Sequence, residues 1–85
     1  MGYSRNPLEG EKLRKALREN LRRFRTEAGY SQGDVARLLG MNRATYPYYE
    51  TGKPTPSVVD LYHLSQLYRR CLEEFFREQE PLEKQ

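Results

Sequence analysis

Side chains able to do covalent or acid–base chemistry are scarce in this sequence. His63 is the only histidine and Cys71 the only cysteine, and neither has neighbours at the spacing of a catalytic triad or a metal cluster. Glu73 and Glu74 are expected to form an acidic helix face rather than a catalytic pair of carboxylates. No glycine-rich phosphate loop and no His-Glu-x-x-His motif is present. The sequence therefore predicts no enzyme: no catalytic residue, no metal site and no cofactor.

The chemistry that remains is the binding of anions by basic side chains. The 85 residues carry 15 Lys and Arg against 12 Asp and Glu, a formal net charge of +3. Basic residues outnumber acidic ones by eight to four in residues 1–30 and by five to three in residues 31–72, whereas residues 73–85 hold two against five. A basic body with an acidic tail suits a polyanionic partner, because clustered Lys and Arg attract phosphates through their summed field.

Length and composition favour one small domain, since so short a chain rarely buries enough apolar surface for two cores. No run approaches the roughly 20 apolar residues that cross a bilayer, and no apolar leader follows Met1. A single cysteine excludes an internal disulfide. We therefore expect a cytoplasmic protein with no membrane association and no small-molecule ligand domain.

Apolar residues recur at every third or fourth position, which predicts an all-α fold of five helices. We expect a loose arm over residues 1–10, a helical domain over residues 11–77 and an acidic tail over residues 78–85. The first helix is predicted from Glu11 to a stop at Gly29. A fourth and a fifth helix follow Pro56 and are separated near residues 69–70.

Between these lie two short helices joined by a tight turn. The first is predicted over residues 32–39 with Ser31 as its N-cap, and the second runs from a cap at Asn42 to about Thr51. Because only Gly40 and Met41 separate them, the two helices must cross steeply. This is the helix-turn-helix geometry, in which the second helix enters the major groove of DNA.

The residues of this segment resemble those of the Xre and phage Cro/repressor family of DNA-binding domains. The resemblance covers about residues 13–76 and rests on the run from Ser31 to Tyr46, the exit Tyr-Glu-Thr-Gly-Lys over residues 49–53, and the closing Leu-Glu-Glu-Phe over residues 72–75. It implies a lambda-repressor-like domain and a sequence-specific DNA-binding transcriptional regulator, expected to be a repressor.

The resemblance also implies which residues contact DNA. Base contacts are expected from Arg43, whose guanidinium matches guanine O6 and N7, and from Ala44 and Tyr48. Contacts to the phosphate backbone are expected from five polar residues. These are Gln32, Asn42, Thr45, Thr51 and Lys53.

Other residues are expected to hold the fold together. Tyr46 and Tyr49 are predicted to face the core rather than the groove. Glu50 matches an acidic position that leans into the interior in the family, and Arg25 is the matching cation. An ion pair between Arg25 and Glu50 is therefore expected to tie the third helix to the first.

Pro47 departs from the family pattern. With Asn42 as cap, its missing N–H and its ring would disturb the carbonyl of Arg43, at a cost of up to about 3 kcal/mol in a helix interior. We therefore expect a bent or widened first turn. A helix starting at Pro47 is the rival interpretation, although it leaves Tyr46 as a poor cap.

The expected partner is double-stranded DNA bound by a homodimer on an inverted repeat, because one recognition helix offers few base contacts. The alternative is a protein-interaction module, such as an antitoxin or an antirepressor-like partner. It would use Leu38, where the family has a polar residue, together with the acidic tail as its docking surface.

Overall fold

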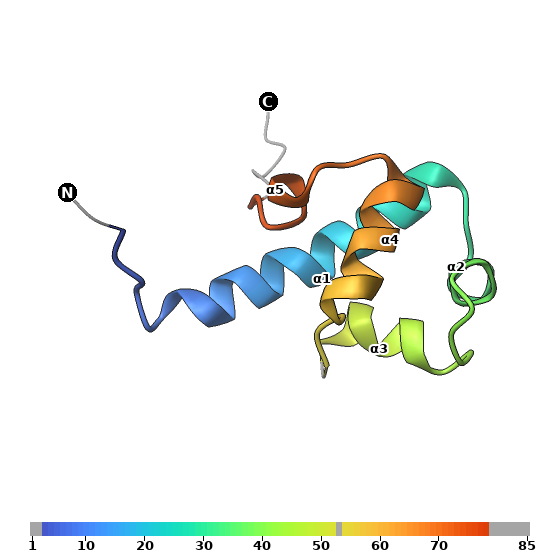
Figure 1. The fold of residues 1–85 in the computed structure, drawn as a ribbon, viewed down its shortest axis with the longest axis horizontal. Coiled ribbons are helices and arrows are strands. Elements are labelled where there is room, and N and C mark those ends of the chain that lie inside the picture. Colours follow the sequence, from blue (N-terminus) through green and yellow to red (C-terminus); the bar gives the residue numbers. More distant parts are fainter. Residues whose placement is uncertain (1–2, 53, 79–85) are drawn as a thin grey trace, which may run out of the picture.

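The computed structural model describes residues 3–52 and 54–78 (Figure 1). All regular secondary structure in these ranges is helical. The elements are α1 (Glu9–Ala28), α2 (Gln32–Leu38), α3 (Thr45–Thr51), α4 (Val58–Tyr68) and α5 (Leu72–Phe75). The prediction of an all-α fold with five helices and a helix-turn-helix in the second and third is therefore confirmed for the described part of the chain.

The long helix α1 is the support for α3, α4 and α5, and α2 packs against α3. Its buried side chains follow one stripe, as the apolar spacing predicts: Ala16, Leu17, Asn20, Leu21 and Phe24. The helix begins two residues before the predicted Glu11, and its N-terminal part extends away from the packed body (Figure 1). None of the described helices, α1 included, is both long and apolar enough to cross a membrane.

Aromatic rings fill the core where α1 meets α3, α4 and α5. The Phe24 ring centroid lies 5.2 Å from that of Phe75 and 6.4 Å from that of Tyr68, both edge to face. The hydroxyl groups of Tyr46 and Tyr68 lie 2.8 Å apart in the interior. Burial raises the pKa of both hydroxyls, so the pair stays protonated and joins α3 to α4 by a hydrogen bond.

Asn20 is a buried polar residue inside the apolar stripe of α1. Its side-chain amide donates to the carbonyls of Phe75 and Arg77, each at 2.9 Å. Phe75 is the last residue of α5, and Arg77 lies two residues beyond it, where backbone carbonyls have no partner within the helix. Asn20 therefore fastens the last helix onto the first across 55 residues of sequence.

Replacing Asn20 with leucine is predicted to destabilise the domain by about 2–4 kcal/mol. The leucine has a similar volume but leaves two carbonyls without their donor, and each unsatisfied buried group costs about 1–3 kcal/mol. Urea unfolding followed by circular dichroism measures the change. Gln66→Leu, at an exposed site on α4, is the control and should change the free energy of unfolding by under about 0.5 kcal/mol. Equal stability of the two variants would contradict the role given to Asn20.

Candidate nucleic-acid interface

The start of α2 is fixed by a reciprocal pair of hydrogen bonds. Ser31 accepts at its hydroxyl from the N–H of Asp34 (3.0 Å), and the Asp34 carboxylate accepts from the N–H of Ser31 (2.9 Å). The hydrogen bonds from the backbone and side chain of Ser31 hold the pKa of Asp34 below its usual range. The predicted N-cap at Ser31 is confirmed. The reciprocal hydrogen bonds between Ser31 and Asp34 form a capping box, which sets where α2 begins.

The turn after α2 is made by backbone hydrogen bonds around Gly40. The N–H of Met41 donates to the carbonyl of Ala36 (2.9 Å), and Gly40 has a φ of 67°, which a residue without Cβ adopts readily. In Figure 1 α2 is seen almost end-on while α3 lies across the view. The predicted steep crossing of these two helices is therefore present.

The third helix begins later than predicted, and Asn42 is not its cap. The Asn42 side-chain oxygen accepts from the N–H of Ala44 (2.8 Å), and its carbonyl accepts from the N–H of Thr45 (2.9 Å). This local turn, typical of asparagine, occupies residues that were expected to be the first helical turn. Helix α3 starts at Thr45, with Ala44 at the cap position and no side-chain cap.

The late start explains how α3 accommodates Pro47. Proline is the third residue of α3, and the first four N–H groups of a helix have no partner within it. The missing donor therefore costs no intrahelical hydrogen bond. The expected distortion, based on a cap at Asn42, and the rival start at Pro47 are both wrong: the helix is shorter at its N-terminal end.

Helix α3 has one face directed to the core and another to solvent. Tyr46 is fully buried and Tyr49 nearly so, and the hydroxyl of Tyr49 donates to Asp60 of α4 at 2.8 Å. Ala44, Tyr48 and Thr51, at spacings of four and three, lie on the opposite, exposed side. The prediction that Tyr46 and Tyr49 belong to the core is confirmed, and the exposed side of α3 is left open to a ligand.

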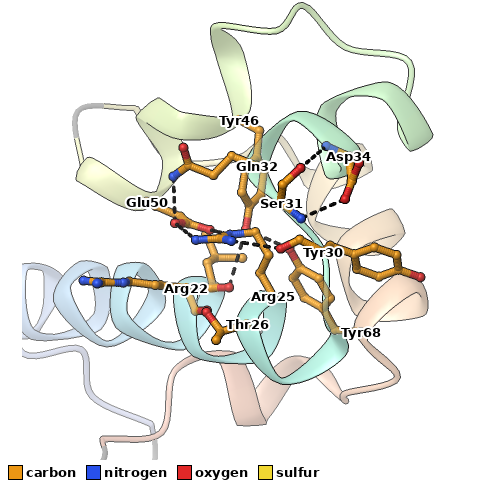
Figure 2. Close-up of polar contacts among 11 residues, drawn as sticks. Arg22, Arg25, Thr26, Tyr30, Ser31, Gln32, Asp34, Tyr46, Glu50 and Tyr68 are labelled. Atoms are coloured by element: carbon orange, nitrogen blue, oxygen red, sulfur yellow. Dashed lines mark hydrogen bonds and ion pairs between the residues drawn. The ribbon is translucent and has the colours of Figure 1, made fainter.

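A polar cluster fixes α3 relative to α1 and α2 (Figure 2). The guanidinium of Arg25 donates to both carboxylate oxygens of Glu50, with Nε–Oε2 at 2.6 Å and Nη2–Oε1 at 3.1 Å. A third group of Arg25 donates to the carbonyl of Tyr30 (2.9 Å), and the amide of Gln32 donates to Glu50 (3.0 Å). The expected ion pair is confirmed, and Gln32, the first residue of α2, adds a hydrogen bond to it.

Electrostatics favour the charged form of this cluster. The side chains of Arg25 and Glu50 are only 16% and 4% exposed, so both charges depend on each other for compensation. Burial alone would raise the pKa of Glu50, but hydrogen bonds from Arg25, Tyr46 and Gln32 outweigh it and lower that pKa. The hydrogen bond to Glu50 likewise raises the pKa of Arg25.

The residues predicted to contact bases lie on the surface around the start and outer side of α3. Arg43, Ala44 and Tyr48 are all exposed, Tyr48 by 54%. No carboxylate of residues 3–52 and 54–78 lies within ion-pair distance of Arg43. These side chains are therefore available to a ligand without breaking a described ion pair.

The predicted phosphate contacts are less uniform. Asn42 is exposed and uses only its oxygen in the turn, so its amide donors remain available. The hydroxyl of Thr51 donates to the carbonyl of Tyr48 (3.2 Å), and Thr45 is half-buried. Gln32 is half-buried and has one amide hydrogen on Glu50. Lys53 lies outside the described residues.

The link between Gln32 and Glu50 was missed at the level of sequence. A carboxylate has about four acceptor sites, and one guanidinium does not fill them. A second partner for the buried Glu50 carboxylate can therefore be expected, but the sequence alone does not say which amide supplies it.

Comparison with known proteins agrees with this arrangement. A family model described as a helix-turn-helix domain matches residues 16–74, which include all five helices except the start of α1 and the end of α5. The chain belongs to this helix-turn-helix family. The earlier resemblance to Xre-like domains is consistent with that membership. The family is a non-enzymatic class, which confirms the prediction that the chain is not an enzyme.

Curated relatives of this helix-turn-helix domain are named as regulators. An uncharacterized HTH-type transcriptional regulator of Archaeoglobus fulgidus is 30% identical over 60 residues, which cover 71% of the chain and 86% of that protein. The SPbeta prophage-derived uncharacterized HTH-type transcriptional regulator YonR of Bacillus subtilis is 43% identical over 49 residues, 58% of the chain and 45% of YonR. The chain thus matches less than half of YonR. No solved structure matches significantly.

Replacing Glu50 with glutamine is predicted to destabilise the domain by about 3 kcal/mol, because the nearly buried guanidinium of Arg25 loses its counter-charge. Urea unfolding at pH 7 measures this loss. Glu19→Gln on the exposed side of α1 makes the same chemical change and should cost under about 0.5 kcal/mol. A cost for Glu50→Gln as small as that of the control would contradict the structural role of the ion pair.

The same carboxylate makes stability depend on pH in the acid range. Folding lowers the pKa of Glu50. The contribution of Glu50 to the free energy of unfolding is therefore complete above its unfolded pKa of about 4.3 and is lost as the pH falls through its lower, folded pKa. The stability difference between wild type and Glu50→Gln should therefore be constant from pH 6 to about pH 5 and shrink below about pH 4. A difference independent of pH down to about pH 2.5 would contradict this.

Replacing Pro47 with alanine is predicted to change the free energy of unfolding by under about 1 kcal/mol, and in the destabilising direction. The reason is that Pro47 occupies the first turn of α3, where its ring restricts the unfolded chain without removing a helical hydrogen bond. Thermal unfolding measures the change. A stabilisation of about 3 kcal/mol would show that the proline strains a helix interior.

Proposed function

We propose that this protein is a cytoplasmic, sequence-specific DNA-binding transcriptional regulator that inserts α3 into the major groove and acts as a repressor. The observation that supports the proposal is the outward side of α3. It presents Arg43, Ala44 and Tyr48 to solvent, while Tyr46 and Tyr49 anchor the opposite side in the core. A helix about 10–12 Å wide fits a major groove about 12 Å wide.

Three residues read the bases in this proposal. Arg43 donates two hydrogen bonds to guanine O6 and N7, a pairing worth about 1–3 kcal/mol of discrimination. The methyl group of Ala44 contacts a thymine methyl, and the ring of Tyr48 packs against a thymine methyl or a sugar. Because Arg43 belongs to the turn before α3 rather than to the helix, it approaches the bases from the helix N-terminal end.

The backbone contacts surround this reading surface. Gln32 donates its second amide hydrogen to a phosphate while the first stays on Glu50, so the ion-pair cluster orients the contact. Asn42 and Thr45 contact phosphates at the entrance to α3, and Thr51 and Lys53 do so at its exit. Thr51 must release the carbonyl of Tyr48 to donate to a phosphate. These contacts position the protein and make affinity depend on salt.

Binding as a homodimer follows from the small reading surface of a single domain. Two protomers on half-sites about one helical turn apart, roughly 34 Å, read twice as many base pairs and bind with higher affinity. An inverted repeat matches the two-fold symmetry of such a dimer. Repression follows when the bound dimer excludes other proteins from the same stretch of DNA.

The test is selection of bound duplexes from a random pool, followed by affinity measurements on the selected sequence. Wild type should prefer the selected duplex to a scrambled one, and binding should weaken steeply between about 50 and 200 mM salt. Arg43→Ala should lose about 1–3 kcal/mol of this preference while its affinity for the scrambled duplex changes little.

Arg69→Ala is the matched control, because Arg69 is an exposed arginine at the C-terminal cap of α4. In Figure 1 this end of α4 is the one that lies away from α3. It should keep the preference for the selected duplex. Failure of the folded wild-type protein to select any sequence would refute the regulator proposal. Capture of a protein partner that Leu38→Ser abolishes, in place of DNA binding, would favour the protein-interaction module, since Leu38 is 54% exposed.

A further inference from the structure

The side of α1 that borders α3 carries arginines at regular helical spacing. Arg18, Arg22 and Arg25 stand at positions i, i+4 and i+7, which places them in one row along the helix. Arg18 and Arg25 are half-buried where α1 borders α3, whereas Arg22 is exposed on the outer side of the same row. Its C-terminal member, Arg25, bonds Glu50 of α3, so the row lies along the edge of the candidate interface.

Arg18 extends this edge to the other end of α3. The side chain of Arg18 covers Gly52, which caps the C-terminal end of α3 with a φ of 99°. A Cβ atom at position 52 would collide with Cδ and Nε of Arg18. The guanidinium is thereby held at the exit turn of α3, at Gly52, the residue after the proposed phosphate contact Thr51.

Neither Arg18 nor Arg22 has a carboxylate within ion-pair distance among the described residues. Glu11 is one acid in electrostatic range of Arg18, and it bonds Arg14 instead, at 3.0 Å. Figure 2 shows the side chain of Arg22 running along α1, away from the cluster of Arg25 and Glu50. Within the described residues, the row thus holds one cation that is paired with a carboxylate, Arg25, and two that make no ion pair.

We propose that Arg18 and Arg22 form a cationic ridge that binds the DNA backbone phosphates flanking α3, a proposal that rests on the proposed DNA-binding function. The ridge connects the contact at Gln32, oriented through Glu50 and Arg25, with the contacts at the exit of α3. Arg18 and Arg22, four residues apart, span about 6 Å of helix, whereas one DNA strand carries a phosphate every 3.4 Å or so along the axis. The ridge is therefore long enough for its two arginines to contact two different phosphates of one strand.

The experiment measures how the affinity of single variants depends on salt, using the selected duplex and a scrambled duplex. Arg18→Gln and Arg22→Gln should each make the slope of log K against log salt shallower by about 0.9, the value for one lost phosphate contact. The loss should be the same on both duplexes, because phosphates carry no sequence information. Arg18→Lys and Arg22→Lys, which keep the charge, should retain the wild-type slope.

Arg69→Gln is the control for removing one positive charge away from the interface. If Arg18→Gln and Arg22→Gln change the salt slope no more than this control does, the proposed ridge is overturned. Thermal unfolding of each variant separates loss of binding from loss of fold. Because glutamine at position 18 also alters the packing on Gly52, the lysine variants test the effect of the charge by itself. If wild type binds DNA and Arg43→Ala loses selectivity while both slopes stay normal, only the ridge fails. If folded wild type binds neither duplex, the proposed function fails with it.

Discussion

The arrangement of the recognition surface depends on the buried ion pair between Arg25 and Glu50. It joins α1 to α3, and the hydrogen bond from Gln32 adds the start of α2. Two charges so far removed from water are tolerated because their geometry is bidentate and because further hydrogen bonds, from Arg25 to the carbonyl of Tyr30 and from Gln32 to Glu50, support the pair. The cluster therefore contributes orientation more than net stability. It fixes the orientation of α1, α2 and α3 relative to one another, and base recognition by a short helix requires such a rigid orientation.

This constraint explains the division of α3 into two sides. Seven residues make an isolated helix unstable in water, so α3 must be stabilised by what it packs against. Tyr46 and Tyr49 supply apolar burial and two hydroxyl hydrogen bonds, to Tyr68 and Asp60, and Glu50 supplies the ion pair. The remaining side of the helix makes no such contacts and is left for Ala44, Tyr48 and Thr51. Stability and recognition thus use different residues of the same short segment.

Much of this could be predicted from sequence, because periodic apolar spacing and helix caps are local signals. The stripe of α1, the cap at Ser31 and the core positions of Tyr46 and Tyr49 were all predicted in this way or by the family resemblance. The start of α3 was not predicted, because asparagine is common both in local turns and at helix caps. Pro47 fits a helix that starts at Thr45, but the sequence alone did not single out that start. The buried role of Asn20 depends on carbonyls 55 and 57 residues away, which no local pattern reveals.

The central claim is that the outer side of α3 is the surface that meets DNA. Titrating the isotope-labelled protein with the selected duplex and following backbone amide resonances tests it directly. The account predicts the largest shifts at Arg43, Ala44 and Tyr48, with smaller ones along the edge of α1 and little change at the C-terminal end of α4. Shifts confined to the surroundings of Leu38, with those of α3 unchanged, would contradict it.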